Sequence, residues 1–228
     1  NVYIMAPNYQ SGKDNVAGFK RYFKGGLSGE VYTTVNQPDY SAEIAQMQSA
    51  KPDALFVFYP GGMGVNFVKQ MRQAGLLGQI PLLSVSTTDG STLPALKETA
   101  LGVISGTFWG PDFNNPASKK FVADFEKKYS RIPSQYAAQA YDSALLIDSA
   151  LKKTGGKATD KAALTNAIRA ADFKSVRGNF RFNKNGFPIQ DMHVFEVAKD
   201  SADRVSLKTV STPLKNLSDP YVTDCPLK

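Results

Sequence analysis

The sequence predicts an α/β protein in which a doubly wound parallel sheet is followed by part of a second α/β lobe. Apolar runs alternate with amphipathic segments from residue 2 to residue 109. Strands that alternate with helices in this way favour right-handed βαβ units in a parallel sheet. After Pro111, helical segments follow one another without an intervening strand, and strand patterns return only near the C-terminus. This break predicts that the chain leaves the first sheet and contributes to another lobe.

Five strands and four helices are expected in the first half. Val2 begins an apolar run that is typical of a strand covered on both faces, and residues 54–59 (ALFVFY) form a longer one. Gly25 and Gly26 end the first helix. The expected strands are 2–6, 29–35, 54–59, 80–85 and 103–109. The expected helices are 12–24, 41–50, 65–74 and 93–99.

The second half is predicted to be helical first and then to return to strands. Asn183-Lys184-Asn185-Gly186 is typical of a hairpin turn between two strands. The expected helices are 116–129, 134–153 and 159–171, and the expected strands are 177–182, 192–197 and 205–210. We therefore expect three segments, with crossings between lobes at 111–116 and 174–178. The first segment, 1–112, is lobe two with its βα repeats. The second, 113–174, is a mainly helical returning segment of lobe one. The third, 175–228, returns to lobe two with a hairpin and a tail.

Composition and charge exclude several classes of protein. The net charge is +7, but the basic residues are scattered and form no stripe interleaved with aromatic residues, which argues against a nucleic-acid partner. No run approaches the roughly 18 apolar residues that a membrane span requires. The single cysteine, Cys225, cannot form an internal disulfide. It is either an unpaired tail thiol or the partner of a cysteine in a preceding segment.

Catalytic and metal-binding patterns are weak. The lone histidine, His193, lies inside an expected strand, and the sequence contains no G-x-S-x-G elbow, phosphate-binding loop or Cys/His cluster. An α/β enzyme of the hydrolase type would have only Asp89 and Asp112 as acids at strand ends. We therefore expect no enzymatic activity, no cofactor and no metal site.

Three loops at the carboxyl ends of expected strands carry polar and aromatic residues. In open α/β sheets these ends form the ligand-binding edge. Hydroxyls, amides and tyrosines without a nearby base suit the binding of a small polar ligand better than its conversion. The alternative is that Ser, Thr and Asp residues such as Asp89 only cap the helices that follow. The loops are 7–12, 59–63 and 86–90.

Four segments follow one another in the order NVYIMAPNYQSGKDNVAGFKRYFKG, KPDALFVFYPGGMGVNFVKQMRQAGL with PLLSVSTTDGSTLPAL after it, PSQYAAQAYDSALLIDSALKKTGG, and GNFRFNKNGFPIQDMHVFEV. Together they resemble the leucine/isoleucine/valine-binding family of type I periplasmic solute-binding proteins. The resemblance implies the extracytoplasmic or periplasmic binding component of an ABC importer, with the permease subunits as partners. The ligand would be a small carboxylate, either a branched-chain or related amino acid or an aromatic acid. A ligand-sensing receptor domain of the same fold is the alternative.

The resemblance also carries over ligand-binding positions and one departure. The family has a preceding half of lobe one that nothing in this sequence matches, so we expect the helix at 134–153 to expose apolar residues and the chain to self-associate through the helices of this lobe. Amino-acid binders often place an acid at the fourth-strand loop, and here the acid is displaced to Asp89. The implied ligand-binding residues are Tyr9, Ser11, Tyr59, Pro60, Gly61, Ser86, Thr87 and Asp89, with Trp109 and Tyr136 as an aromatic wall.

Overall fold

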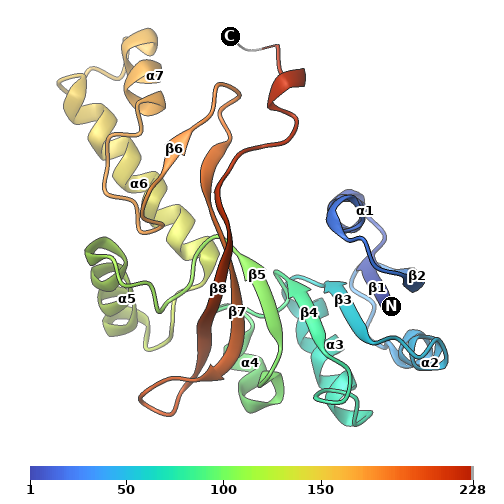
Figure 1. Cartoon of the computed structure of the whole chain (residues 1–228). Helices are drawn as coiled ribbons and strands as arrows, with labels where there is room; N and C mark the ends of the chain where they lie inside the picture. The colour runs from blue at the N-terminus through green and yellow to red at the C-terminus, as the bar shows by residue number, and fades with distance from the viewer. Residues whose placement is uncertain (227–228) are drawn as a thin grey trace. The chain divides into compact units, whose positions relative to one another are not determined.

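The chain forms two compact units in a computed structural model that describes residues 1–226 (Figure 1). The first unit comprises residues 1–107 and 194–210, and the second comprises residues 108–193 and the chain from residue 211 onward. The chain therefore passes between the units three times, after Thr107, His193 and Val210.

The first unit is built on a sheet whose strands follow the order β2-β1-β3-β4-β5-β7, with β8 paired to β7. Neighbouring strands among β1 to β5 are parallel. The strands are β1 (Val2–Pro7), β2 (Leu27–Thr33), β3 (Ala54–Phe58), β4 (Leu82–Val85), β5 (Ile104–Thr107), β7 (Pro188–Lys199) and β8 (Val205–Leu217). The helices are α1 (Gln10–Tyr22), α2 (Ser41–Ser49), α3 (Gly62–Gln73) and α4 (Leu93–Leu96), which continues into the 3-10 turn η1 (Lys97–Ala100).

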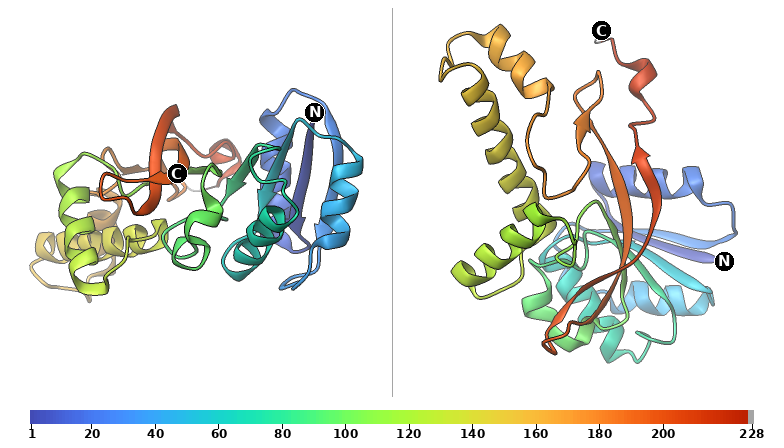
Figure 2. Two further views of the ribbon diagram at one scale, coloured as in Figure 1. Left: turned by 90° about the horizontal axis from the view of Figure 1, so that it is seen from below. Right: turned by 60° about the vertical axis from the view of Figure 1, so that its left-hand side comes forward.

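Helices cover both faces of this sheet, as the apolar strands require. In the right-hand view of Figure 2, α1 lies on one side of the strands and α2 and α3 lie on the other. On the α1 side, Ile4 and Phe56 are partners in neighbouring strands and pack against Val16 of α1. Successive side chains of a strand point to opposite faces, so Met5 faces the other layer, where Phe67 of α3 is buried. The doubly wound parallel sheet expected from the sequence is confirmed.

Two glycines allow helices of this unit to begin very close to the strands that precede them. A Cβ atom at Gly12 would lie 2.0 Å from the carbonyl oxygen of Pro7. A Cβ atom at Gly64 would lie 2.3 Å from the carbonyl oxygen of Tyr59 and 3.0 Å from that of Thr87. Only glycine fits such backbone contacts. These glycines therefore set the distance between each helix and the loops at the carboxyl edge.

The second unit is mainly helical, and its helices begin at side-chain caps. The Asn115 side chain accepts a hydrogen bond from the Ser118 amide, and the Ser134 hydroxyl accepts one from the Ala137 amide. Trp109, Phe121, Ala138 and Val176 form its buried core. The elements are α5 (Pro116–Tyr129), α6 (Gln135–Lys153), α7 (Lys161–Arg169), β6 (Arg181–Phe182) and η2 (Val222–Asp224), together with the remaining parts of β7 and β8.

The later strands and the segment boundaries differ from the expected ones. The strand expected at 177–182 is reduced to β6, whereas β7 and β8 are longer than expected. The hairpin is present, with β6 antiparallel to β7. The return to the first unit was expected at residue 175, but residues 175–193 belong to the second unit. The physical reason is that Asp142 of α6 accepts a hydrogen bond from the Val176 amide and Asn115 donates to the Val176 carbonyl.

Candidate functional site

Three loops of the first unit meet at the carboxyl edge of the sheet because β1, β3 and β4 are adjacent and parallel. The Tyr59 amide, which follows β3, donates a 3.0 Å hydrogen bond to Thr87 Oγ1 in the loop after β4. The Tyr9 ring, which follows β1, stacks on Phe58 with ring centroids 6.4 Å apart. The sequence-predicted residues around Tyr9, Tyr59 and Thr87 are thus brought together within one unit.

The loop after β4 is held in place by its own side chains. The Asp89 amide donates to Thr92 Oγ1 at 3.0 Å, and the Thr92 hydroxyl donates to the Thr87 carbonyl at 3.1 Å. Asp89 Oδ1 accepts two hydrogen bonds of 2.6 Å, from the amide and the hydroxyl of Ser91. Ser86 begins the loop with φ of 55°, in the left-handed region that non-glycine residues seldom adopt. Asp89 therefore holds the loop together through Ser91, whereas the N-cap of α4 is Thr92, without a side-chain capping bond.

Thr88 is a residue of this loop that the sequence did not single out. Its side chain is buried, and Oγ1 has no hydrogen-bond partner among the described residues. Buried hydroxyls normally have a partner, so each exception needs an explanation such as an ordered water. Residues 86–88 all carry hydroxyl groups, so the sequence does not indicate which hydroxyl is left without a hydrogen-bond partner.

Tyr59, expected to bind ligand from the loop after β3, has its side chain in the core of the unit instead. Its side chain is fully buried, and its hydroxyl accepts a 3.1 Å hydrogen bond from Thr33 Oγ1. Its ring centroid lies 5.1 Å from that of Tyr40 and 5.0 Å from that of Phe67. Burial raises the pKa of the Tyr59 phenol well above its ordinary value, so it stays neutral. Thr33 and Tyr40 complete this cluster from distant parts of the sequence.

The other predicted residues of the first unit leave atoms on its surface. Tyr9 is half-buried at the N-cap of α1 and makes no side-chain capping bond. Ser11 and Gly61 are exposed, and Pro60 is half-buried. Gly61 has φ of +61°, which suits glycine at the sharp turn between β3 and α3. These residues, together with Ser86, give this edge an aromatic ring, hydroxyls and backbone groups.

Trp109 and Tyr136 belong to the second unit. Trp109 is buried, and its indole Nε1 donates a 3.0 Å hydrogen bond to Ser118 Oγ of α5. Its ring centroid lies 5.6 Å from that of Phe121. The structure therefore assigns Trp109 to the core of its unit, which corrects its expected place in an aromatic wall. Tyr136 is 48% exposed on α6.

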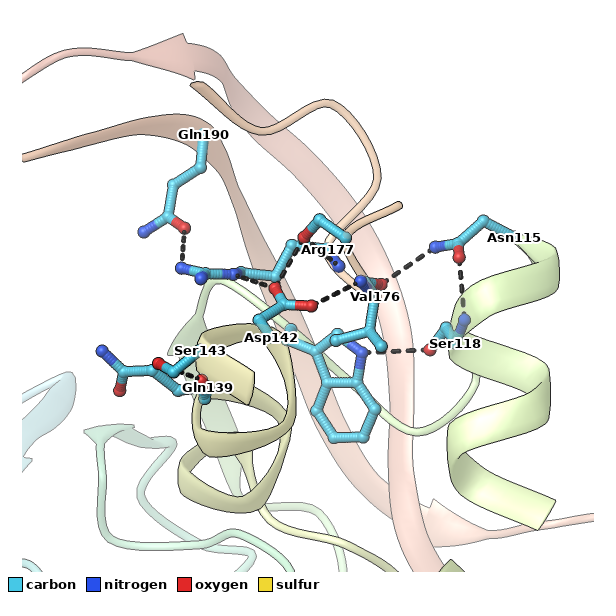
Figure 3. Close-up of polar contacts among 10 residues, drawn as sticks. Asn115, Ser118, Gln139, Asp142, Ser143, Val176, Arg177 and Gln190 are labelled. Atoms are coloured by element: carbon cyan, nitrogen blue, oxygen red, sulfur yellow. Dashed lines mark hydrogen bonds and ion pairs between the residues drawn. The ribbon is translucent and has the colours of Figure 1, made fainter. Parts of the chain in front are cut away.

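A buried polar network of the second unit was missed by sequence reasoning (Figure 3). Asp142 Oδ2 accepts hydrogen bonds from Ser175 Oγ at 2.6 Å and from Arg177 Nε at 2.8 Å. Arg177 Nη1 donates to Gln190 Oε1 at 2.9 Å, and its guanidinium lies 4.2 Å from the centroid of the Phe180 ring. Acids are frequent on helices, so nothing in the sequence marked Asp142. The network has internal partners and serves to hold α6 to the segment that follows α7.

Two features are absent from residues 1–226. No group of three or more His, Cys, Asp and Glu side chains in this part of the chain could hold a metal ion. No helix within these residues has the length and apolar character that a membrane crossing requires.

This chain is similar to known proteins in both sequence and architecture. A sequence model of the family described as periplasmic binding protein matches residues 1–202. The Leu/Ile/Val-binding protein homolog 6 of Brucella melitensis is 29% identical over 209 residues, which cover 87% of this chain and 53% of that protein. The chain thus spans about half the length of the curated relatives it matches.

Two solved structures extend the comparison. One is a solute-binding protein of an ABC transporter from R. palustris in complex with benzoate, with a TM-score of 0.90 and 26% sequence identity. The alignment covers 99% of this chain and 61% of the solved chain. A solute-binding protein of an ABC transporter from Rhodopseudomonas palustris BisB5, in complex with 3,4-dihydroxy benzoic acid, has a TM-score of 0.87 and 30% identity. That alignment covers 96% of this chain and 61% of the solved one.

Proposed function

The chain belongs to the periplasmic binding protein family, and from this membership we propose that it is the solute-binding component of an ABC importer and acts outside the cytoplasm. In this proposal the two units are the two lobes, and the solute is held by the loops at the carboxyl edge of the first unit. Hinge movement of two lobes is a known way to trap a ligand. The permease subunits in the membrane would be its partners.

We propose an aromatic carboxylate as the first candidate ligand. The observation that carries this choice is the state of Asp89, whose Oδ1 is occupied by the amide and hydroxyl of Ser91. An amino-acid ligand brings an ammonium group that needs an acceptor, and the one acid of this loop is buried and has one of its two oxygens engaged by Ser91. A benzoate needs hydrogen-bond donors and an apolar surface, and the residues that we propose for these roles are Ser86 and Tyr9, both half-buried at this edge. The benzoate and dihydroxybenzoate complexes of similar proteins support the same choice.

A branched-chain amino acid is the second candidate. It is favoured by the curated relatives, which are named Leu/Ile/Val-binding protein homologues. An ammonium group would then have to reach the buried Asp89, whose Oδ1 already accepts from Ser91. Ser91→Ala removes one of the two hydrogen bonds to Asp89 Oδ1. It should strengthen leucine binding if this candidate is correct. It should have no effect on benzoate binding if the first candidate is correct.

Calorimetry with a panel of benzoate, 3,4-dihydroxybenzoate and leucine tests the proposal. We expect benzoate-type acids to release more heat than leucine under the same conditions. Tyr9→Ala should abolish this heat, whereas Tyr22→Ala, at an exposed tyrosine of the helix that follows Tyr9, should not. Equal loss in both variants, or no heat with any acid, would contradict the assignment.

The proposal also includes an absence of turnover and a tendency to associate. The loops of the carboxyl edge contain no histidine, and the one histidine lies in β7. We therefore expect no hydrolysis of ester, amide or glycoside substrates. Exposed apolar side chains on α5 and α6 favour self-association of this chain.

A further inference from the structure

Three of the buried polar atoms in the first unit, Tyr3 Oη, Tyr40 Oη and Glu43 Oε2, have no hydrogen-bond partner within residues 1–226. Tyr3 and Tyr40 are 2% and 0% exposed, and Glu43 is half-buried. A buried hydroxyl normally has a partner, and one that is left without any is unfavourable. The three atoms come from two elements of one unit, since Tyr3 lies in β1 and the other two residues lie at the start of α2.

The three side chains share the face of the sheet that α2 and α3 cover (Figure 2). Tyr3 points to this face, because the residues on either side of it pack against α1 and successive side chains of a strand alternate. Its ring lies over Gly29 of β2, where a Cβ atom would come within 2.3 Å of it. Tyr40 is the N-cap of α2 and Glu43 is its third residue, a pair of positions whose side chains lie close together. The Tyr40 ring centroid is 5.1 Å from that of Tyr59.

The carboxylate acts on the phenols through space and bonds to neither of them. Burial has the largest influence and raises the pKa of Tyr3, and it raises that of Tyr40 to about 12. The negative charge of Glu43 raises the pKa of both phenols further, as a nearby like charge does. Both phenols therefore keep their protons at neutral pH and are hydrogen-bond donors. Neither makes a hydrogen bond to Glu43 Oε2, so the groups are neighbours with space for a bridging molecule.

The unmet bonding needs of this cluster are those of one water molecule. Gln37 Nε2 donates a 2.9 Å hydrogen bond to Glu43 Oε1, which leaves Oε2 as the buried acceptor. The cluster thus offers two donors, the phenols, and one acceptor. A water accepts two hydrogen bonds and donates two, and buried waters typically make about three. A cation would bind Oε2 but would leave both phenol hydrogens without an acceptor.

We propose that an ordered water bridges Tyr3 Oη, Tyr40 Oη and Glu43 Oε2, accepting a hydrogen bond from each phenol and donating one to the carboxylate. This water ties β1 to the first turn of α2. Tyr40 packs against Tyr59, whose amide donates to Thr87 Oγ1 at the carboxyl edge. The site therefore supports a residue of the proposed ligand-binding loops from inside the unit. It needs no solute, so it can be tested even if the proposed function is wrong.

Tyr3→Phe and Tyr40→Phe test the proposal, because a bridged and an unbridged hydroxyl predict different signs. Each variant keeps the ring and loses one water-mediated hydrogen bond, which is nearly as favourable as a direct one. The equilibrium constant of unfolding, measured in urea, should therefore rise roughly three- to tenfold. Tyr22→Phe, at a 65% exposed tyrosine of α1, is the matched control and should leave it unchanged. Phenylalanine variants that are as stable as the wild type or more stable would overturn the proposal, because removal of an unpartnered hydroxyl has that effect.

Two further measurements identify the bridging molecule. In the double variant Tyr3→Phe/Tyr40→Phe the equilibrium constant should rise by less than the product of the two single factors, because both phenols bind one water. A simple product would overturn the shared site. A crystal structure of the chain should show a water about 2.6–3.2 Å from each of the three atoms. A direct bond between a phenol and Glu43, or a peak with anomalous scattering after a soak in rubidium chloride, would overturn the assignment in favour of an unbridged cluster or a cation.

Discussion

Arg177 Nε donates a 2.8 Å hydrogen bond to Asp142 Oδ2, and the two side chains are only 7% and 1% exposed. The pair joins α6 to the segment after α7, and its continuation through Gln190 reaches β7 (Figure 3). Both carboxylate oxygens of Asp142 are in use, since Oδ1 accepts from the Val176 amide. Such a pair fixes geometry even where its net contribution to stability is small, because each charge needs the other once both are buried.

Removal of one charge should therefore be strongly destabilising. Asp142→Asn leaves the Arg177 guanidinium buried without its counter-charge, and the expected loss is about 3–5 kcal/mol in the free energy of unfolding. Urea denaturation followed by circular dichroism measures it. Asp148→Asn is the matched control on the same helix, because its ion pair with Lys152 is exposed and should matter little. Similar losses in both variants would show that burial of the pair is not the cause.

Substitution by valine should affect the stability of the chain differently at two neighbouring threonines. Thr87→Val removes the acceptor of the Tyr59 amide and should cost about 1–3 kcal/mol, because a buried donor is left without a partner. Thr88→Val removes a buried hydroxyl that has no partner among the described residues, so it should be neutral or stabilising. Thermal unfolding of the two variants side by side checks the order. A larger loss at Thr88 would mean that its hydroxyl has a partner such as a tightly bound water.

Substitution by alanine should change the stability of the chain in opposite directions at two helical glycines. Gly64→Ala would force a Cβ within 2.3 Å of the Tyr59 carbonyl oxygen and should displace the loops of the carboxyl edge, with a loss of several kcal/mol or misfolding. Gly18→Ala, in α1, meets nothing within 4 Å and should stabilise the chain by up to about 1 kcal/mol through helix propensity. Urea midpoints measure both effects. A stable, unperturbed Gly64→Ala variant would contradict the close approach.

The fold could be predicted from the sequence because its signals are local. The apolar run of residues 54–59 and the glycines that follow it mark a buried strand and the turn after it, and both are present as β3 and the start of α3. Helices such as α5 carry their own caps and periodic apolar residues, and its predicted range of 116–129 agrees with the structure. Such patterns depend on neighbours in the sequence, which a single sequence displays in full.

The site was predicted less well because its details depend on distant partners. Tyr59 and Trp109 have polar tips that suggest a ligand, yet Thr33 and Ser118 already satisfy them. Neither partner lies within eight residues of the aromatic side chain, so no local pattern announces it. The same limit hid Arg177, which pairs with an acid 35 positions away. Burial and pairing across elements decide whether a polar residue is available, and the sequence does not contain them directly.

An apolar surface of the second unit underlies the last prediction. Tyr129 of α5 and Ile147 of α6 are 50% and 52% exposed. Between these helices lies an open groove of ≈ 370 Å³. The side chains that line it are mostly apolar or aromatic, and they are Phe121, Asp124, Phe125, Lys128, Tyr129, Ala137, Ala140 and Tyr141. Contiguous exposed apolar side chains mark surfaces that become covered by protein.

We therefore expect the purified chain to form dimers or larger oligomers that dissociate on dilution, as measured by sedimentation velocity over a concentration series. The double variant Tyr129→Glu/Ile147→Glu should shift the chain toward monomer, because each glutamate would have to be desolvated in an apolar interface. Tyr22→Glu is the matched control, since Tyr22 is 65% exposed on α1 of the first unit and should not affect association. Circular dichroism of all three chains establishes that they are folded. A wild-type chain that remains monomeric at every concentration would contradict the prediction, and an equal effect of the control would place the interface elsewhere on the chain.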